Sequence, residues 1–268
     1  MISKVEVDGT IYRNEQDSIG SREVPEDVYY GVQSLRAAEN FHITGLYMHP
    51  EIINSLACIK KAAAITNCEA GLLDKKIANA IVKACDEIIA GKLHENFIVD
   101  PIHGGAGTSL NMNANEVIAN RAIEILGGEK GDYSIVNPND HVNCSQSTND
   151  VIPTAGKMTS LRLLTRTKKE LRRLYEALCQ KAEEFDHVLK MGRTQMQDAV
   201  PIRLGQEFKA YSVAIMRDIN RMDKAMDEMR TLNMGGTAVG TGLNADPVYL
   251  RRIVPNLAEI SGMELVQA

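Results

Sequence analysis

Apolar residues recur every three or four positions through most of the chain after residue 50, a spacing typical of amphipathic helices. Between about Glu51 and Gly91 the pattern is broken at Gly71, which predicts a pair of helices. A third helix is predicted from about Asn111 to Leu126, because two glycines follow it. We therefore expect a mainly α-helical fold.

The segment before about Gly45 has a different pattern. It is rich in turn-forming glycine, and apolar residues alternate with polar ones around Val5 and Val7. This pattern predicts a small β-hairpin within an N-terminal arm that wraps around the helices.

Two longer helices are predicted from about Thr154 to Asp186 and from about Arg203 to Leu232. At about 1.5 Å per residue each would be roughly 45 Å long, well beyond an average globular helix. Small residues lie beside the main apolar stripe and widen it: Ala177, Ala182, Ala210, Ala214 and Ala225. Because two helices cannot cover such wide faces for each other, we expect part of a larger bundle. An exposed coiled-coil arm is the alternative.

Composition and charge narrow the classes of partner. The chain is 44% hydrophobic and 24% charged, with a net charge of -5, so it has no surplus of cations for nucleic acid or an anionic membrane. Charged residues interrupt the first residues of the chain, and the longest apolar runs are far shorter than a membrane span. We expect a cytoplasmic protein without nucleic-acid or membrane partners.

The cysteines do not suggest metal or redox chemistry. They are scattered without a Cys-x-x-Cys pair, at Cys58, Cys68, Cys85, Cys144 and Cys179. We expect free, mostly buried thiols, no bound metal and no cofactor. Cys144 lies within a polar motif, where a bystander role is favoured over nucleophilic attack.

Three polar segments contain few charges and many amides, hydroxyls or glycines. The first runs from His103 to Ser109, followed by three asparagines. A glycine-rich turn that leads into a helix can offer N–H groups and a hydroxyl to an anion. The segment lacks the Gly-Lys-Ser/Thr ending of a phosphate-binding loop, and an ordinary helix start remains an equal alternative.

The second segment, Asn137 to Asp150, places eleven polar side chains within fourteen residues, just before the first long helix. Burying so many short polar groups is unfavourable unless something completes their hydrogen bonds. The segment therefore predicts a pocket for a small carboxylate at a helix N-terminus, where the helix dipole favours negative charge. A solvated capping loop is the alternative.

The third segment, Met191 to Pro201, joins the two long helices and is longer than a common helix connection. Its arginine, threonine, glutamines and aspartate suggest ligand contact, with a plain connector as the alternative. A helix of roughly 45 Å would separate this segment from the second one within a subunit. A shared site therefore predicts an oligomer with antiparallel subunits.

The order and content of several motifs resemble the fumarase and aspartase superfamily. The resemblance spans about residues 17–265 and rests on Asp17-Ser-Ile-Gly-Ser-Arg-Glu-Val-Pro, Tyr29-Tyr-Gly-Val-Gln, and the segments 107–120, 137–150, 192–207 and 235–244. It implies an N-terminal helical domain with a β-hairpin arm at 1–150 and an incomplete central long-helix bundle at 151–268. It also implies a homotetramer.

Three positions favour the aspartase branch over class II fumarases. Fumarases resemble this chain but usually have serine where it has Thr148, and histidine where it has Asn137 and Gln195. An imidazole at position 195 could handle protons, whereas glutamine can only donate and accept hydrogen bonds. Class II fumarate hydratase remains the alternative enzyme, and a non-catalytic structural relative is a further alternative.

The resemblance implies elimination of ammonia from L-aspartate to give fumarate, through an aci-carboxylate intermediate. The residues expected to hold the β-carboxylate are Thr108, Ser147 and Thr148. The residues expected to orient the amino group and the α-carboxylate are Asn149, Thr194 and Gln195. Of these, Thr194 and Gln195 are the expected catalytic positions.

One departure from the family affects the chemistry. The family takes its general base from a serine in a mobile Gly-Ser-Ser-x-Met-Pro-x-Lys-x-Asn loop, and this motif does not occur in the sequence. We expect that the parent enzyme is a lyase and that this chain alone shows no turnover.

Overall fold

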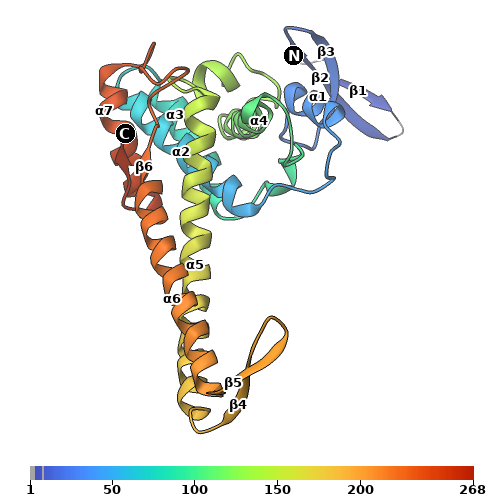
Figure 1. Ribbon diagram of the computed structural model, residues 1–268. Coiled ribbons are helices and arrows are strands. Elements are labelled where there is room, and N and C mark those ends of the chain that lie inside the picture. Colours follow the sequence, from blue (N-terminus) through green and yellow to red (C-terminus); the bar gives the residue numbers. More distant parts are fainter. Residues whose placement is uncertain (1–3, 8) are drawn as a thin grey trace. The chain divides into compact units, whose positions relative to one another are not determined.

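The computed structural model describes residues 4–7 and 9–268 (Figure 1). Residues group into two compact units, one containing the chain up to Thr159 together with Thr231–Ala268, the other containing Ser160–Arg230. The fold is mainly helical with small sheets, which confirms the expected fold class. The division into domains at residue 150 stays a prediction.

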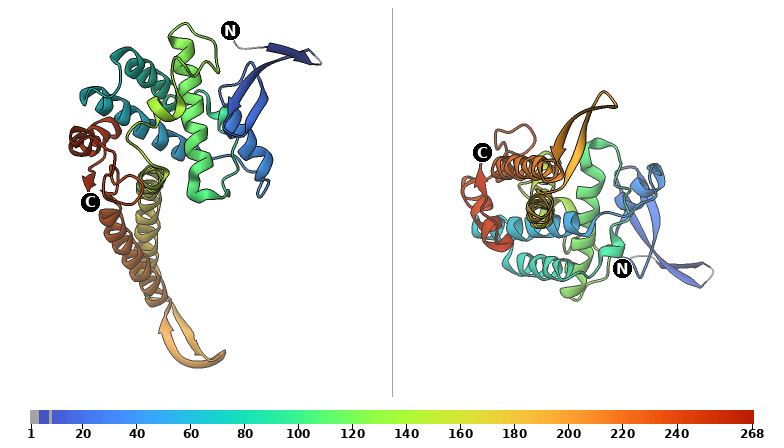
Figure 2. Two further views of the ribbon diagram at one scale, coloured as in Figure 1. Left: turned by 90° about the horizontal axis from the view of Figure 1, so that it is seen from above. Right: turned by 60° about the horizontal axis from the view of Figure 1, so that its bottom comes forward.

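Helices form the centre of the first unit where the apolar spacing predicts them. They are α2 (Pro50–Glu69), α3 (Lys75–Ile89) and α4 (Thr108–Ile125). Helix α2 packs against α3, and α3 packs against α4 (Figure 2). The contacts are made by fully buried aliphatic side chains such as Leu56, Ile81 and Ile118.

The N-terminal arm is a three-stranded antiparallel sheet rather than a single hairpin. Its strands β1 (Lys4–Val7), β2 (Thr10–Asp17) and β3 (Gly20–Pro25) lie in chain order. Strand β1 contains the predicted Val5 and Val7, and their side chains lie outside the described part of the chain.

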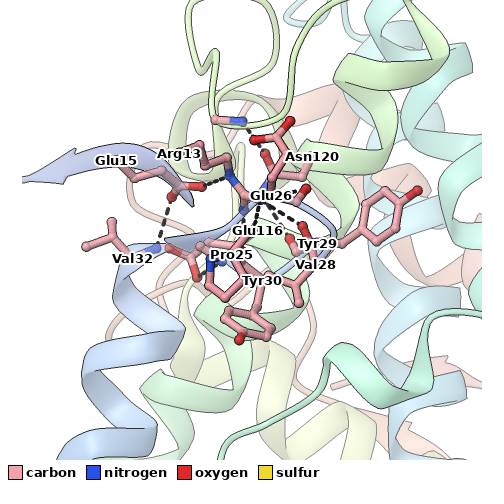
Figure 3. A network of polar contacts seen from close by, with 12 residues as sticks. Arg13, Glu15, Pro25, Glu26, Val28, Tyr29, Tyr30, Val32, Glu116 and Asn120 are labelled. Atoms are coloured by element: carbon pink, nitrogen blue, oxygen red, sulfur yellow. Dashed lines mark hydrogen bonds and ion pairs between the residues drawn. The ribbon is translucent and has the colours of Figure 1, made fainter. Parts of the chain in front are cut away.

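A buried ionic network holds the arm in the first unit (Figure 3). The Arg13 guanidinium has no exposed surface and forms an ion pair with Glu15 at 2.8 Å. It also donates hydrogen bonds to the backbone carbonyls of Pro25, Val28 and Tyr30. The network replaces the hydration that a buried guanidinium loses.

Helix α1 (Val32–Asn40) is an element that the apolar spacing does not predict. Its N-terminal N–H groups are satisfied by Glu116 of α4, which accepts hydrogen bonds from the N–H groups of Gly31, Gln33 and Ser34. Burial, together with neighbouring Glu15, raises the pKa of Glu116 to about 7, although the Ser34 hydrogen bonds lower it. A carboxylate distant in the sequence thus caps this helix.

Short elements complete the first unit around the polar segments. They are the 3-10 turns η1 (His94–Asn96) and η2 (Gly105–Gly107) and the π-helical turn η3 (Pro138–Val142). Helix α7 (Pro247–Ser261) packs against α2, and β6 (Thr231–Leu232) pairs in parallel with β7 (Val266–Gln267).

The long helices that the sequence predicts are α5 (Thr148–Glu184) and α6 (Leu204–Met229). Helix α5 has 37 residues, which corresponds to roughly 55 Å at about 1.5 Å per residue. Within the second unit, Lys168 of α5 forms an ion pair with Asp223 of α6. Large apolar side chains of this unit are exposed, among them Leu174, Tyr211 and Val213. The incomplete bundle stays a prediction.

Residues between the two long helices form a hairpin, which the composition of this segment does not predict. Its strands are β4 (Leu189–Thr194) and β5 (Gln197–Arg203). Gly192 permits their close approach, because a Cβ there would lie 2.8 Å from the carbonyl oxygen of Val200.

The cysteines are all free, as expected, but only Cys58 and Cys85 are buried. Within residues 4–7 and 9–268, no group of three or more metal-ligating side chains is found. No helix of the same residues has the length and apolar character needed to cross a membrane.

Candidate functional site

A polar cavity of about 480 Å³ lies in the first unit. Its walls come from the start of α4, from the second polar segment (Asn139, Asn143 and residues 145–148), and from the loop 237–244. Ser147 and Thr148 both line it, at the N-terminal end of α5. The hydroxyl of Ser147 accepts the N–H of Asn149, so its own proton is available to a ligand.

The buried carboxylate of Asp150 fixes two of these walls. One of its oxygens accepts the N–H of Ser147 at 3.0 Å, and the other accepts the N–H groups of Gly235 and Thr237 at 3.3 and 3.0 Å. Burial raises the pKa of Asp150, and these hydrogen bonds to the carboxylate limit the rise. Asp150 therefore ties the first turn of α5 to the glycine-rich loop.

A second buried charge lies behind the same wall. Lys60 of α2 is fully buried and donates hydrogen bonds to the side-chain oxygens of Asn143 and Gln146. Burial lowers the pKa of Lys60 to about 7, while the charge of Asp150 raises it. Both of its amide partners line the cavity.

Asn149 joins the helix start to the loop instead of lining the cavity. Its side-chain N–H donates to the carbonyl of Ala238 at 2.8 Å, and its own carbonyl accepts from the Asn233 side chain at 3.0 Å. The side chain is exposed at the edge of the cavity wall. Its amide is thus already engaged by the protein.

Thr108 begins α4, and its hydroxyl donates to the carbonyl of Gly105 at 2.6 Å. The preceding Gly107 packs against Ile152 of α5, where a Cβ would come within 2.8 Å of that side chain. One turn further along α4, Asn111 lines the cavity. The first and second polar segments are therefore brought together in one unit.

Thr194 and Gln195 belong to the second unit, at the tip of the β4–β5 hairpin. Thr194 pairs with Gln197, so the two tip residues are Gln195 and Met196. Both tip residues have positive φ, at 49° and 62°, and both are exposed. Such a turn normally uses asparagine or glycine, so this backbone is strained.

Lys60, Asp150 and the loop 237–244 are parts of the site that sequence reasoning did not assign. The loop was noted only as one of the matching segments. Lys60 stands beside Lys61 on a helix, a pattern usual for a solvated face. The site offers the neutral hydroxyls of Ser147 and Thr148 to an anion at a helix N-terminus, which suits a small carboxylate.

A family model described as "Lyase" matches residues 20–268, which is most of the chain. The chain belongs to this lyase family. Its resemblance to the fumarase and aspartase superfamily is confirmed by aspartate ammonia-lyases that are between 46 and 58% identical to it.

Among the relatives of this lyase-family chain, an aspartate ammonia-lyase of Bacillus subtilis is 58% identical over 96% of the chain and 54% of its own length. A solved "fumarate lyase:delta crystallin" of Brucella melitensis bound to cobalt has a TM-score of 0.92 and 49% identity, with 96% of this chain and 56% of that one covered. A class II fumarase of Schistosoma mansoni has a TM-score of 0.87 and 38% identity, over 94% and 53%. The chain spans about half the length of the relatives it matches.

Proposed function

We propose that the protein is part of an aspartate ammonia-lyase, which eliminates ammonia from L-aspartate to give fumarate. The observation that carries the proposal is the cavity at the start of α5, where Ser147 and Thr148 present neutral donors at a helix N-terminus. The 58% identity to the Bacillus subtilis aspartate ammonia-lyase supports the choice of reaction.

The proposed reaction begins with removal of a proton from the carbon next to the β-carboxylate. The electron pair left behind gives an aci-carboxylate dianion, and its collapse forms the carbon–carbon double bond as ammonia leaves the neighbouring carbon. Negative charge on the β-carboxylate grows in the transition state, so preorganised donors there accelerate the reaction. We assign this role to Ser147, Thr148 and Thr108.

We assign the amino group and α-carboxylate to Asn149 and to Thr194 and Gln195 of another subunit in the proposed oligomer. A glutamine amide cannot act as a base, so Gln195 would orient the substrate. The strained backbone at Gln195 supports a functional requirement, because residues kept in rare conformations cluster at active sites. Asn149 would have to exchange or share its hydrogen bond to Ala238 to reach a substrate.

The general base and the oligomer are further parts of the proposal. The family's serine loop does not occur among the 268 residues, so we propose that this chain alone has no turnover. We also propose a homotetramer, supported by the exposed apolar side chains of the second unit. We propose that the protein has no nucleic-acid partners, because its net charge of -5 leaves no surplus of cations to neutralise phosphates. The cytoplasmic location stays a prediction.

The test measures fumarate formation from L-aspartate by ultraviolet absorbance in the full-length protein that contains this chain. Thr148→Val removes one donor and should lower kcat/KM about 100-fold. Thr167→Val is the matched control, because its exposed hydroxyl only bonds the carbonyl of Leu163 on the same helix. Equal activity of both variants would contradict the proposed role of Thr148.

The likeness to a class II fumarase favours fumarate hydratase as a second candidate. That enzyme would convert fumarate to malate without dependence on ammonia, so malate formation by the same protein decides between the two. No activity of the full-length protein on either substrate would instead favour a structural relative, and unchanged kinetics in Thr194→Ala would contradict the role assigned to Thr194.

A further inference from the structure

Lys60 is a lysine with no exposed surface, an unusual situation for this residue type. Its ammonium nitrogen lies 2.8 Å from Oδ1 of Asn143 and 2.9 Å from Oε1 of Gln146. A buried ammonium is unfavourable unless its donors are satisfied, and both acceptors come from the polar turn that forms a wall of the cavity.

The ammonium determines how this turn is hydrogen-bonded. Because it has donors and no acceptor, both amides must present oxygen to it and turn their NH₂ groups elsewhere. The Asn143 NH₂ donates to the carbonyl of Gln146, and the Gln146 NH₂ donates to the carbonyls of Val142 and Cys144. Lys60 thus selects the amide orientations that close the turn.

Asn67 holds the same turn from the same face of α2, two helical turns further along. Its NH₂ donates to the carbonyl of Cys144 at 2.9 Å, and its side-chain oxygen accepts the Ser145 hydroxyl at 2.8 Å. Ser145 has a φ of 60°, a conformation that a residue other than glycine adopts only when its surroundings stabilise it.

We infer that Lys60 is a positioning residue, which acts with Asn67 to hold the turn 143–147 in the form that directs Ser147 and Thr148 at a carboxylate. The inference rests on the proposed function. Lys60 does not line the cavity and acts through the turn. Since a shift of about 1 Å in a site can lower a rate by about 100-fold, a turn fixed from behind has direct consequences for turnover.

The experiment compares Lys60→Met, Lys60→Arg and Asn67→Leu in the full-length protein. Lys61→Met is the matched control, because the neighbouring Lys61 forms only a partly exposed ion pair with Asp86. Hydrogen exchange of the backbone amides of residues 144–149 reports the order of the turn. Values of kcat and KM report its effect on the reaction.

We expect Lys60→Met to speed hydrogen exchange in residues 144–149. We also expect it to lower kcat at least about tenfold and to change KM less than about threefold, because the lost contacts act on the transition state. Lys60→Arg keeps the charge and the hydrogen-bond donors, so its exchange rates and its kcat should lie between those of Lys60→Met and the wild type. Asn67→Leu should speed exchange in the same residues, and Lys61→Met should match the wild type.

The inference would be overturned if Lys60→Met had the same hydrogen-exchange rates in residues 144–149 and the same kcat as the wild type. If Lys60→Met fails to fold, Asn67→Leu decides, and wild-type exchange and kcat in that variant also overturn the inference. A wild-type protein with no activity on aspartate would contradict the proposed function instead. In that case the exchange of residues 144–149 still shows whether Lys60 holds the turn.

Discussion

The turn 143–147 and the tip of the β4–β5 hairpin have similar polar sequences but are held in different ways. Two buried charges, Lys60 and Asp150, and the Asn67 amide anchor the turn within its unit. The hairpin tip is exposed and places Gln195 and Met196 in a strained backbone. Density of polar residues thus indicates a functional segment, but it does not reveal whether that segment is preorganised.

Removing the Asp150 charge should have the largest effect on stability. Asp150→Asn leaves an NH₂ group against backbone N–H groups and removes the negative charge that favours protonated Lys60, so we expect the free energy of unfolding to fall by about 3 kcal/mol. Urea denaturation followed by circular dichroism measures this change. A loss below about 1 kcal/mol would show that the turn does not depend on this anchor.

Asp186→Asn is the matched control from the second unit. Its exposed carboxylate forms an ion pair with Arg203 at 2.9 Å. Because exposed pairs contribute about 0–1 kcal/mol, we expect little change in the free energy of unfolding.

A pH series tests whether a buried carboxylate also stabilises a second turn of the first unit. Asp100 accepts the N–H groups of Thr44, Gly45 and Ile102. Burial alone would raise the pKa of Asp100, but these hydrogen bonds lower it well below its usual range. A depressed pKa means that Asp100 stabilises the fold above its unfolded pKa, near 3.8, and that this contribution is lost as the pH falls.

We therefore expect the wild type to have a higher Tm than Asp100→Asn at about pH 5, with the difference shrinking towards pH 2 or so. Thermal melts at several pH values measure it. A difference that stays constant over this range would rule out the ionised carboxylate as the stabilising species.

Relief of strain at the hairpin should give the smallest effect, and one of opposite sign. Met196→Gly keeps Gln195 and removes a side chain from a residue with φ of 62°. We expect Met196→Gly to raise the free energy of unfolding by up to about 1 kcal/mol, because glycine adopts a positive φ without strain. The larger entropy of glycine in the unfolded chain reduces this gain. Met191→Gly, in strand β4, should destabilise instead, and hydrogen exchange of the hairpin amides distinguishes the two variants.

Helix positions could be predicted because apolar spacing is a local signal that tertiary packing reinforces. Helices α2 to α6 therefore appear close to where the sequence places them. Helix α1 was missed because it is short and its N-terminus is satisfied by Glu116, which lies about 80 residues away. The hairpin was missed because Gln195 and Met196 lack the usual turn residues.

The sequence marks Ser147 and Thr148 because dense hydrogen-bond donors precede a helix, and both residues line the cavity. Their role in binding a carboxylate stays a prediction, and the residues that support them could not be predicted. The role of Lys60 depends on its partners in a segment about 83 residues away. No local pattern distinguishes a lysine with such partners from a surface lysine.

The discontinuity of the first unit has a consequence for the order of assembly. Asp150 binds Ser147 nearby in the chain, but its other partners, Gly235 and Thr237, follow the whole of the second unit. During synthesis the N-terminal residues emerge first, so Asp150 can bind Gly235 and Thr237 only after some eighty more residues have left the ribosome. The wall of the cavity that the loop 237–244 forms is therefore the last to become available during synthesis, after the whole of the second unit.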